Sequence, residues 1–307
     1  MSNISVVIPS YQRAEIVLDT IALLLDQVVP ADEIIIVDQT AYANSDRFAK
    51  ELRQLDLDGK IRWIRLDQPS IPHAMNVGLT RAKSDYVLFL DDDSSFKPTL
   101  IQAYCDYLDQ EDVVAVVGQV VQPYEVPTEL PLSYQAGSGI YRDLSFKFYA
   151  TEDRWIHNCM AGNLLVDKHQ AQQAGGFDQQ FEGVAYRFET EFCRRLIRHS
   201  GQAFLFGSKA SIDHLKLASG GTRSKVRNFL TSSSPVHSQG DYYFALRESQ
   251  GIERCKYIAV RFFGSIIARF YVRNPWWIPV RLVGEMRGLA VALRKHWQSP
   301  IYLIADE

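Results

Sequence analysis

The sequence predicts an α/β fold in which helices cover both faces of a mainly parallel central sheet. Apolar, strand-like runs alternate with segments of helical spacing over about 95 residues, an order typical of right-handed βαβ units. One of these runs, Tyr86–Leu90, is apolar or aromatic throughout, as in a strand buried on both faces. It ends at three consecutive carboxylates, Asp91, Asp92 and Asp93. Ligands of such sheets bind beyond the carboxyl ends of the strands, so this strand end is the first candidate site.

The other elements follow from the same periodicities. Alternation or continuous apolar runs predict strands, and apolar residues three or four positions apart predict helices. The expected strands cover 4–8, 33–37, 61–66, 86–90, 113–121, 203–206 and 210–212, the expected helices cover 14–27, 44–55 and 73–82, and an apolar segment at 159–166 ends the sheet region.

A long segment, residues 122–157, has no clear periodicity and is rich in aromatic side chains. A loop of this length is unusual in a compact domain unless it binds something. It is either a binding loop or a surface flap packed by its own aromatic rings.

Composition favours an ordered chain with a sizeable core over a disordered or disulfide-rich one, and no nucleic-acid partner is expected. The 307 residues are 47% hydrophobic and 22% charged. None of the four cysteines (Cys105, Cys159, Cys193 and Cys255) forms a C-x-x-C pair, so neither a zinc knuckle nor a disulfide framework is expected. We expect a cytoplasmic protein without a signal peptide, because a strand begins at Ile4 with no basic segment ahead of it.

The carboxylate triplet has two interpretations. Three adjacent carboxylates repel one another, and a hard cation such as Mg²⁺ or Mn²⁺ would remove that repulsion. Alternatively, the triplet is a solvated acidic turn that caps a helix beginning near 97–98. The chain has no G-x-G-x-x-G and no P-loop motif, so a nucleotide diphosphate would have to be held by the metal. Asp38, at another strand end, is either a ribose or base partner or a helix cap.

A later helix and the loop after the last strand supply further candidates. The apolar residues of 187–196 share one helical face, and Glu189 lies on the shoulder of that face near the helix start. Glu191 points away from it and is expected to be solvated. His214 precedes a loop that contains Gly220, Gly221 and Arg223.

Taken together, these residues resemble glycosyltransferase family 2, inverting enzymes of the GT-A fold. The resemblance covers roughly residues 3 to 225, and the order and spacing of its motifs are specific for the family but not for the sugar. It is carried by Val7-Ile8-Pro9-x-Tyr11-x-Arg13, Ile36-Val37-Asp38, Asn76-x-Gly78, Phe89-Leu90-Asp91-Asp92-Asp93, Gly175-Gly176-Phe177-Asp178 and His214 before Gly-Gly-x-Arg.

The resemblance implies a role for each matching residue. The triplet corresponds to the family's D-x-D motif, so Asp93, with Asp91 and His214, would hold Mn²⁺ or Mg²⁺. His214 could instead contact the diphosphate or be structural. Glu189 would be the catalytic base, with Glu182 on the preceding loop as its rival. The nucleotide-sugar would be bound by Pro9, Tyr11, Arg13, Asp38, Asn76, Asp91, Asp92 and Arg223.

The sequence departs from the family at two of these positions. The family often has Glu-Asp where this chain has Phe188-Glu189, so the base is one methylene longer. An arginine common before the D-x-D strand is replaced by Met75, and its phosphate contact is absent or comes from Arg81 or Arg223.

The resemblance also implies an organisation and an activity. Residues 1–230 would form the GT-A domain, with a nucleotide-binding half at about 1–95 and an acceptor half at about 96–230, and 231–307 a helical extension. The enzyme would move a sugar from a UDP-, GDP- or dTDP-sugar to a hydroxyl of a saccharide or lipid-linked acceptor, with inversion, in bacterial-type polysaccharide or glycolipid synthesis. A sugar-phosphate nucleotidyltransferase and an inactive GT-A binding module are the alternatives.

The C-terminal segment is strongly basic in a chain whose net charge is −3. Residues 254–297 contain nine Lys or Arg and one acidic residue, Glu285. Lys256, Arg261 and Arg269 each cost roughly 2.5–3.5 kcal/mol at a bilayer centre, so the segment should not span a membrane. A helix at 280–297 would have one apolar face, made of Leu282, Val283, Met286, Leu289, Ala290, Leu293 and Trp297.

Two interpretations of this segment remain open. Its helices either lie on the inner face of an anionic membrane or pack on the catalytic domain with their basic face in water. In the first case, truncation near residue 250 would release the protein from the membrane and spare donor hydrolysis.

Overall fold

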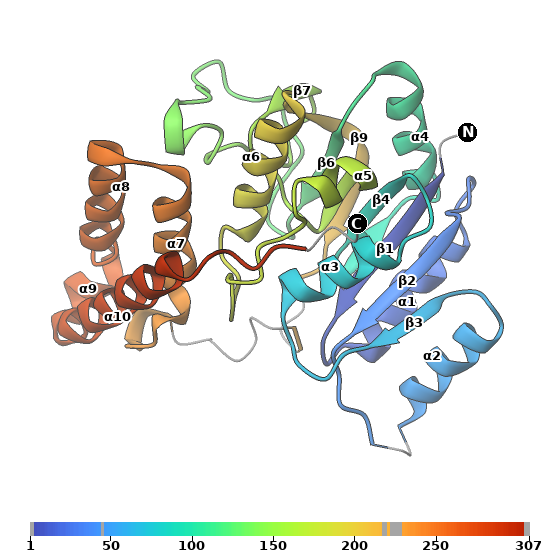
Figure 1. The fold of residues 1–307 in the computed structure, drawn as a ribbon, viewed down its shortest axis with the longest axis horizontal. Coiled ribbons are helices and arrows are strands. Elements are labelled where there is room, and N and C mark those ends of the chain that lie inside the picture. The colour runs from blue at the N-terminus through green and yellow to red at the C-terminus, as the bar shows by residue number, and fades with distance from the viewer. Residues whose placement is uncertain (1–2, 44–45, 217–219, 222–228, 304–307) are drawn as a thin grey trace.

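The computed structural model describes residues 3–43, 46–216, 220–221 and 229–303, and it contains one mixed sheet with helices on both faces (Figure 1). Neighbouring strands follow the order β3-β2-β1-β4-β8-β6-β9-β5, and β7 pairs with β9. The strands are β1 (Ile4–Ser10), β2 (Glu33–Asp38), β3 (Arg62–Arg65), β4 (Tyr86–Leu90), β5 (Ser94–Phe96), β6 (Ala115–Val121), β7 (Arg154–Ile156), β8 (Asn163–Asp167) and β9 (Phe204–His214).

The first half of the sheet is parallel, as the alternation of strands and helices predicts. Strands β3, β2, β1 and β4 pair in parallel, so their carboxyl ends lie at one edge. The second half is mixed. The segment 159–166 does not end the sheet, because β8 lies in its centre, antiparallel to both β4 and β6. The two expected late strands are one long strand, β9, whose pairing with β6 shifts register after Gly118.

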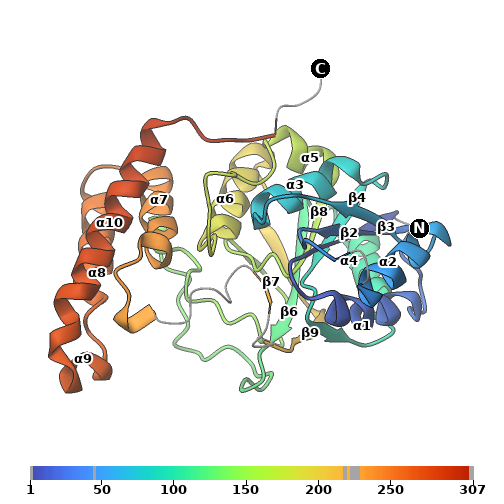
Figure 2. The same cartoon turned by 90° about the horizontal axis from the view of Figure 1, so that it is seen from below.

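Helices cover the two faces of the sheet, as Figure 2 shows. Successive residues of β1 point to opposite faces, so Val6 and Ile8 join one apolar cluster and Val7 the other. Helices α1, α2 and α4 cover the first face, and α3, α5, α6 and α7 cover the second. The helices are α1 (Ala14–Leu25), α2 (Arg47–Leu57), α3 (Ile71–Arg81), α4 (Leu100–Gln110), α5 (Lys168–Gln173), α6 (Phe188–Ser200), α7 (Gln239–Glu248), α8 (Gly251–Gly264), α9 (Arg269–Arg273) and α10 (Ile278–Trp297).

The segment 122–157 contains the short strand β7 and is packed in part by its own rings. Phe146 makes edge contacts with Tyr134 and Phe148, and it also packs on Phe206 of β9. Tyr124, in contrast, is exposed. The interpretation as a flap packed by its own aromatics therefore describes the part of the segment around Phe146.

The C-terminal helices form a layer beside α6, seen at the left of Figure 1. Helix α7 contacts α6, and α10 packs on α7. Beyond α10 the chain returns to the catalytic body, where Leu303 N donates to Gly175 O at 2.8 Å and Gln179 N donates to Ile301 O at 3.0 Å. Within the described part of the chain, no helix has the length and hydropathy needed to cross a membrane.

A chain of buried charges joins these helices to the start of α6. Asp241 of α7 accepts from Arg261 of α8 at 2.7 Å and from Arg187, the residue before α6, at 3.3 Å. Tyr257 donates to the same carboxylate at 2.8 Å. Arg187 has a left-handed backbone, with φ of 72°, and its ion pair with Asp241 ties the entry of the helix that carries Glu189 to α7.

We expect Asp241→Asn to lower the free energy of unfolding by about 3 kcal/mol, the loss typical of a broken buried ion pair, because Arg187 and Arg261 would both lose the charge of Asp241. Urea denaturation measures this loss. The matched control, Asp19→Asn on the exposed side of α1, should stay within about 0.5 kcal/mol of the parent. An equal effect of both variants would contradict a structural role for the network.

These contacts change the expectation for truncation near residue 250. The deletion removes Tyr257 and Arg261 from Asp241, and it removes the backbone pairing of Ile301 and Leu303 with the loop before α6. We therefore expect the truncated protein to lose stability together with donor hydrolysis.

Candidate active site

Polar side chains from the ends of β1 and β4 and from the start of α1 meet at the carboxyl edge of the parallel half-sheet. Ser10, the last residue of β1, donates its hydroxyl to Asp92 at 2.8 Å. Arg13, at the start of α1, lies 2.8 Å from a carboxylate oxygen of Asp92 and 3.0 Å from one of Asp93. The arginine therefore neutralises part of the charge of the triplet from the buried side.

The three carboxylates of the triplet have different surroundings. Asp92 and Asp93 are buried, whereas the side chain of Asp91 is 48% exposed. Gly162 faces Asp91, and a Cβ at that position would lie 2.2 Å from the carboxylate. The glycine thus leaves room for the carboxylate that opens toward the cavity. The alternative of a uniformly solvated acidic turn does not describe this triplet.

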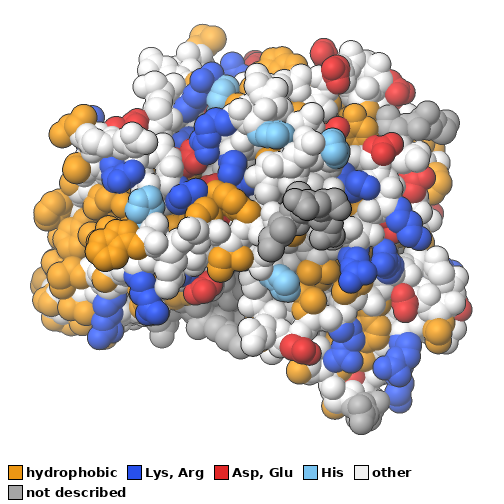
Figure 3. Space-filling view, in the orientation of Figure 1, with side chains coloured by type: hydrophobic (Ala, Val, Ile, Leu, Met, Phe, Trp, Pro, Cys, Tyr) orange, Lys and Arg blue, Asp and Glu red, His pale blue; other side chains and the backbone are white. Residues whose placement is uncertain are grey.

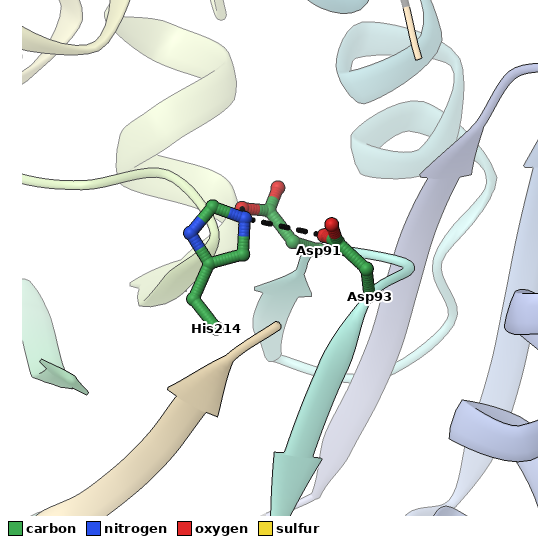
Figure 4. A group of neighbouring side chains, drawn as sticks. All are labelled: Asp91, Asp93 and His214. Carbon is green, nitrogen blue, oxygen red and sulfur yellow. Dashed lines mark ion pairs between the residues drawn. The ribbon is translucent and has the colours of Figure 1, made fainter. Parts of the chain in front are cut away.

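His214 reaches the triplet through the pairing of β5 with β9. Ser94 lies opposite His214 in that antiparallel ladder, and Leu215 N donates to Asp93 O at 2.9 Å. The Nε2 atom of His214 is then 3.2 Å from Asp93 and 3.8 Å from Asp91, while Nδ1 contacts Gln122 at 3.1 Å. Figure 4 shows the three side chains pointing toward one another.

The arrangement of Asp91, Asp93 and His214 fits a divalent cation. One ligand atom from each lies within 4.8 Å of the others. Two carboxylates with one imidazole suit Mn²⁺, since carboxylates favour Mg²⁺ or Mn²⁺ and imidazole is a ligand for transition metals. The second ring nitrogen of the histidine is held by Gln122, which orients the ring.

Burial and neighbouring charges shift the pKa values of two groups here. Burial raises the pKa of Asp92 to about 6, and the ion pair with Arg13 opposes that shift. For His214, burial lowers the pKa, but the hydrogen bond to Asp93 and the charges of Asp91 and Asp93 raise it by more, so the net shift is upward. A bound cation would compete with the proton for this ring.

The triplet borders a cavity of about 420 Å³ that also contains Glu189. Glu189 is the second residue of α6, partly buried, and its carbonyl accepts from the thiol of Cys159 at 3.2 Å. A carboxylate from α6 and a candidate metal site from the ends of β4 and β9 therefore line the same cavity. The cavity is lined by Pro9, Ser10, Tyr11, Arg13, Gln39, Ile71, Met75, Asp91, Asp92, Asp93, Met160, Ala161, Gly162, Phe188, Glu189, His214, Lys216, Gly220 and Gly221.

The other two glutamates of this region lie elsewhere. Helical spacing alone predicts that Glu191 is solvated, but the structure buries it. Its carboxylate pairs with Arg195 at 2.8 Å, and the hydroxyl of Tyr302 lies 3.4 Å away. The returning C-terminal segment covers the side of α6 that would otherwise face water. Glu182 is 65% exposed, pairs with Lys295 at 3.0 Å, and does not line the cavity.

Two predicted nucleotide contacts make hydrogen bonds within the protein. Asp38 is buried at the end of β2, where it accepts from Tyr42 at 2.7 Å and from Trp63 at 3.1 Å, and its neighbour Gln39 lines the cavity in its place. The side-chain amide of Asn76 donates to the carbonyl of Phe177 and accepts from its backbone N–H, at 2.7 Å in each case. In this structure Asn76 fixes the turn that precedes α6.

The remaining predicted residues divide between the cavity and its surroundings. Pro9, Tyr11 and Arg13 line the cavity, and so does Met75, at the position where the family often has arginine. Arg81 is not among the lining residues, and Arg223 lies outside the described residues.

Lys216 also lines the cavity, although sequence reasoning did not select it. Its ammonium group lies over the ring of Tyr124 at 4.6 Å, and its backbone has a positive φ of 50°. The sequence does contain a signal for this residue, because Lys216 follows the candidate metal ligand His214 by two positions. Its charge makes it a partner for an anionic ligand.

The cluster of two carboxylates and an imidazole lies beyond the strand ends of an α/β sheet, which is where folds of this class bind their ligands. The profile of the family described as "Glycosyl transferase family 2" matches residues 5–172. The chain belongs to this family.

Relatives and solved structures agree with this assignment. Chondroitin synthase from Escherichia coli is 32% identical over 121 residues, which are 38% of this chain and 17% of that protein, so the chain spans about a sixth of its relative. The S. aureus TarS 1-349 structure in complex with UDP-GlcNAc has a TM-score of 0.60 at 14% identity, over 96% of this chain and 81% of TarS. Mannosyltransferase PcManGT from Pyrobaculum calidifontis, in complex with GDP-Man and Mn2+, has a TM-score of 0.55 at 13% identity, over 95% and 75%.

The likeness to these structures confirms the GT-A fold. The chain is therefore a member of glycosyltransferase family 2 with the GT-A fold.

Proposed function

We propose that this protein is a metal-dependent, inverting glycosyltransferase that uses a nucleoside-diphosphate sugar. The observation that carries the proposal is the shared cavity, which is lined by Asp91, Asp93 and His214 and also by Glu189. The solved relatives were obtained with UDP-GlcNAc and with GDP-Man and Mn2+, which supports a nucleotide-sugar donor and a divalent cation here.

Asp93, Asp91 and His214 would hold Mn²⁺ or Mg²⁺, which when bound supplies Lewis-acid stabilisation of the diphosphate leaving group. Charge develops on the leaving oxygen as the bond to the anomeric carbon breaks. Lys216 lines the same cavity and can stabilise that charge. Arg13 holds Asp92 and Asp93 in place.

Glu189 would take the proton of the acceptor hydroxyl on the opposite face of the sugar. The acceptor oxygen forms the new bond to the anomeric carbon while the bond to the diphosphate breaks, and the nucleoside diphosphate leaves. A positioned base of this kind contributes about 10²–10⁴-fold to the rate. One displacement inverts the anomeric configuration and needs no enzyme nucleophile.

The acceptor class and location extend this proposal. The acceptor would be a saccharide or a lipid-linked saccharide in polysaccharide or glycolipid synthesis, and the donor a UDP-, GDP- or dTDP-sugar. The basic C-terminal segment supports a cytoplasmic enzyme held peripherally on the inner face of an anionic membrane, where lipid-linked acceptors are found.

A screen of nucleotide-sugars with Mn²⁺ tests the function. We expect slow hydrolysis of one donor to free sugar and nucleoside diphosphate, with activity abolished by EDTA and restored by Mn²⁺. Release of pyrophosphate from a nucleoside triphosphate and a sugar phosphate would instead identify a nucleotidyltransferase. Donor binding without turnover in the presence of any saccharide acceptor would indicate an inactive binding module.

A further inference from the structure

Helix α10 buries three charged residues, Arg281, Glu285 and Lys295, and exposes several apolar ones, among them Met286, Leu293 and Trp297. Arg281 and Glu285 are fully buried and form an ion pair at 2.5 Å, and Lys295 is buried against Gln180. Glycine permits this close packing: a Cβ on Gly288 would lie 2.1 Å from the hydroxyl of Ser238. Of the apolar face that periodicity predicts, Leu289 packs on the core, whereas Met286, Leu293 and Trp297 face the solvent.

The neighbouring elements also expose large apolar side chains. Phe263 at the end of α8 is 62% exposed, Ile267 is 82% exposed, Val272 on α9 is 85% exposed, and Trp276 is 64% exposed. We call these four residues the apolar tip. Figure 3 shows hydrophobic side chains gathered over α8, α9 and the start of α10, at the left end of the molecule. Clustered exposed apolar residues of this kind mark an interaction surface.

The charge around the apolar tip indicates its partner. Arg269 and Arg273, at the two ends of α9, are exposed, as are Lys256 and Arg287 on the adjoining helices. The one acidic residue between 254 and 297, Glu285, is buried, so the exposed side chains of this segment carry no carboxylate to oppose an anion. Apolar and tryptophan side chains flanked by exposed cations match the boundary between acyl chains and anionic headgroups.

We infer that the apolar tip inserts into the headgroup boundary of an anionic bilayer while Arg269 and Arg273 contact its phosphate groups. Arg261 of α8 pairs with Asp241 of α7 and with Glu285 of α10, which holds the three helices together while the four side chains of the apolar tip stay exposed. The inference deepens the proposed membrane location by assigning the surface. Its test needs no acceptor, so it can fail independently of the glycosyltransferase proposal.

Sedimentation of the full-length protein with phosphatidylglycerol–phosphatidylcholine vesicles tests the inference. We expect binding at low salt that weakens as salt rises and is much weaker on pure phosphatidylcholine. Each cation near such a surface contributes about fivefold, so Arg269→Gln with Arg273→Gln should weaken binding by about 30-fold. Ile267→Ser with Trp276→Ser should reduce binding to both kinds of vesicle.

Matched controls come from α2, far from the tip in the sequence. Lys50→Gln with Arg53→Gln removes two exposed cations, and Leu57→Ser removes an exposed apolar side chain. These controls should bind as the parent does, and all variants should retain its unfolding transition and donor hydrolysis. Equal loss in tip and control variants would overturn the inference. The inference is also overturned if the parent does not bind anionic vesicles at low salt. If the parent instead forms dimers that Ile267→Ser with Trp276→Ser converts to monomers, the apolar tip is an interface between copies of the chain.

Discussion

Asp93→Ala should abolish metal-assisted nucleotide binding and lower kcat by at least about 10³-fold, on the order of 4 kcal/mol. Asp93 is the buried member of the candidate metal cluster, with an oxygen 3.2 Å from His214 and another 3.0 Å from Arg13. Without it, the cluster retains one half-exposed carboxylate and one imidazole, too few ligands for a hard cation. Isothermal titration with Mn²⁺ and nucleotide, together with donor hydrolysis, measures both effects.

Two controls separate loss of metal from loss of fold. Asp93→Asn keeps the volume of the side chain and should show the same loss of Mn²⁺ binding, while circular dichroism and urea titration report whether either variant still folds. Asp106→Ala, on the exposed side of α4, should leave activity unchanged. Full activity of the parent in EDTA would rule out metal dependence.

Glu189→Gln should keep donor affinity and lower kcat for transfer by about 10²–10⁴-fold, the range expected when a general base is lost. The substitution preserves shape and removes the ability to take a proton. Glu189 lines the cavity from the first turn of α6, whose entry is fixed by Arg187 and Asp241. Titration of the nucleotide-sugar and steady-state kinetics with acceptor separate binding from catalysis.

The control for this base is Glu182→Gln. Glu182 is exposed and pairs with Lys295 outside the cavity, so its replacement should leave kcat within about twofold of the parent, as most surface changes do. An inactive Glu182→Gln beside an active Glu189→Gln would show that the base has been assigned to the wrong carboxylate.

The sequence by itself determined the elements whose signal is local. The apolar run Tyr86–Leu90 and its neighbours specify strands buried on both faces, and the helical spacing between them specifies crossovers, so the parallel half-sheet follows. Because parallel strands end at one edge, the placement of the triplet beside Ser10 and Arg13 follows as well. The start of α6 at Phe188 was likewise set by periodicity.

Only the tertiary structure decided the contacts between residues far apart in the chain. His214 contacts Asp93 because β9 pairs antiparallel with β5. The side chain of Asn76 hydrogen-bonds the backbone of Phe177, 101 positions away. Periodicity states which residues share a helical face, but not what covers that face. Thus Glu191 is buried by the returning C-terminal segment, and α10 turns Arg281 and Glu285 inward, because their partners come from other parts of the fold.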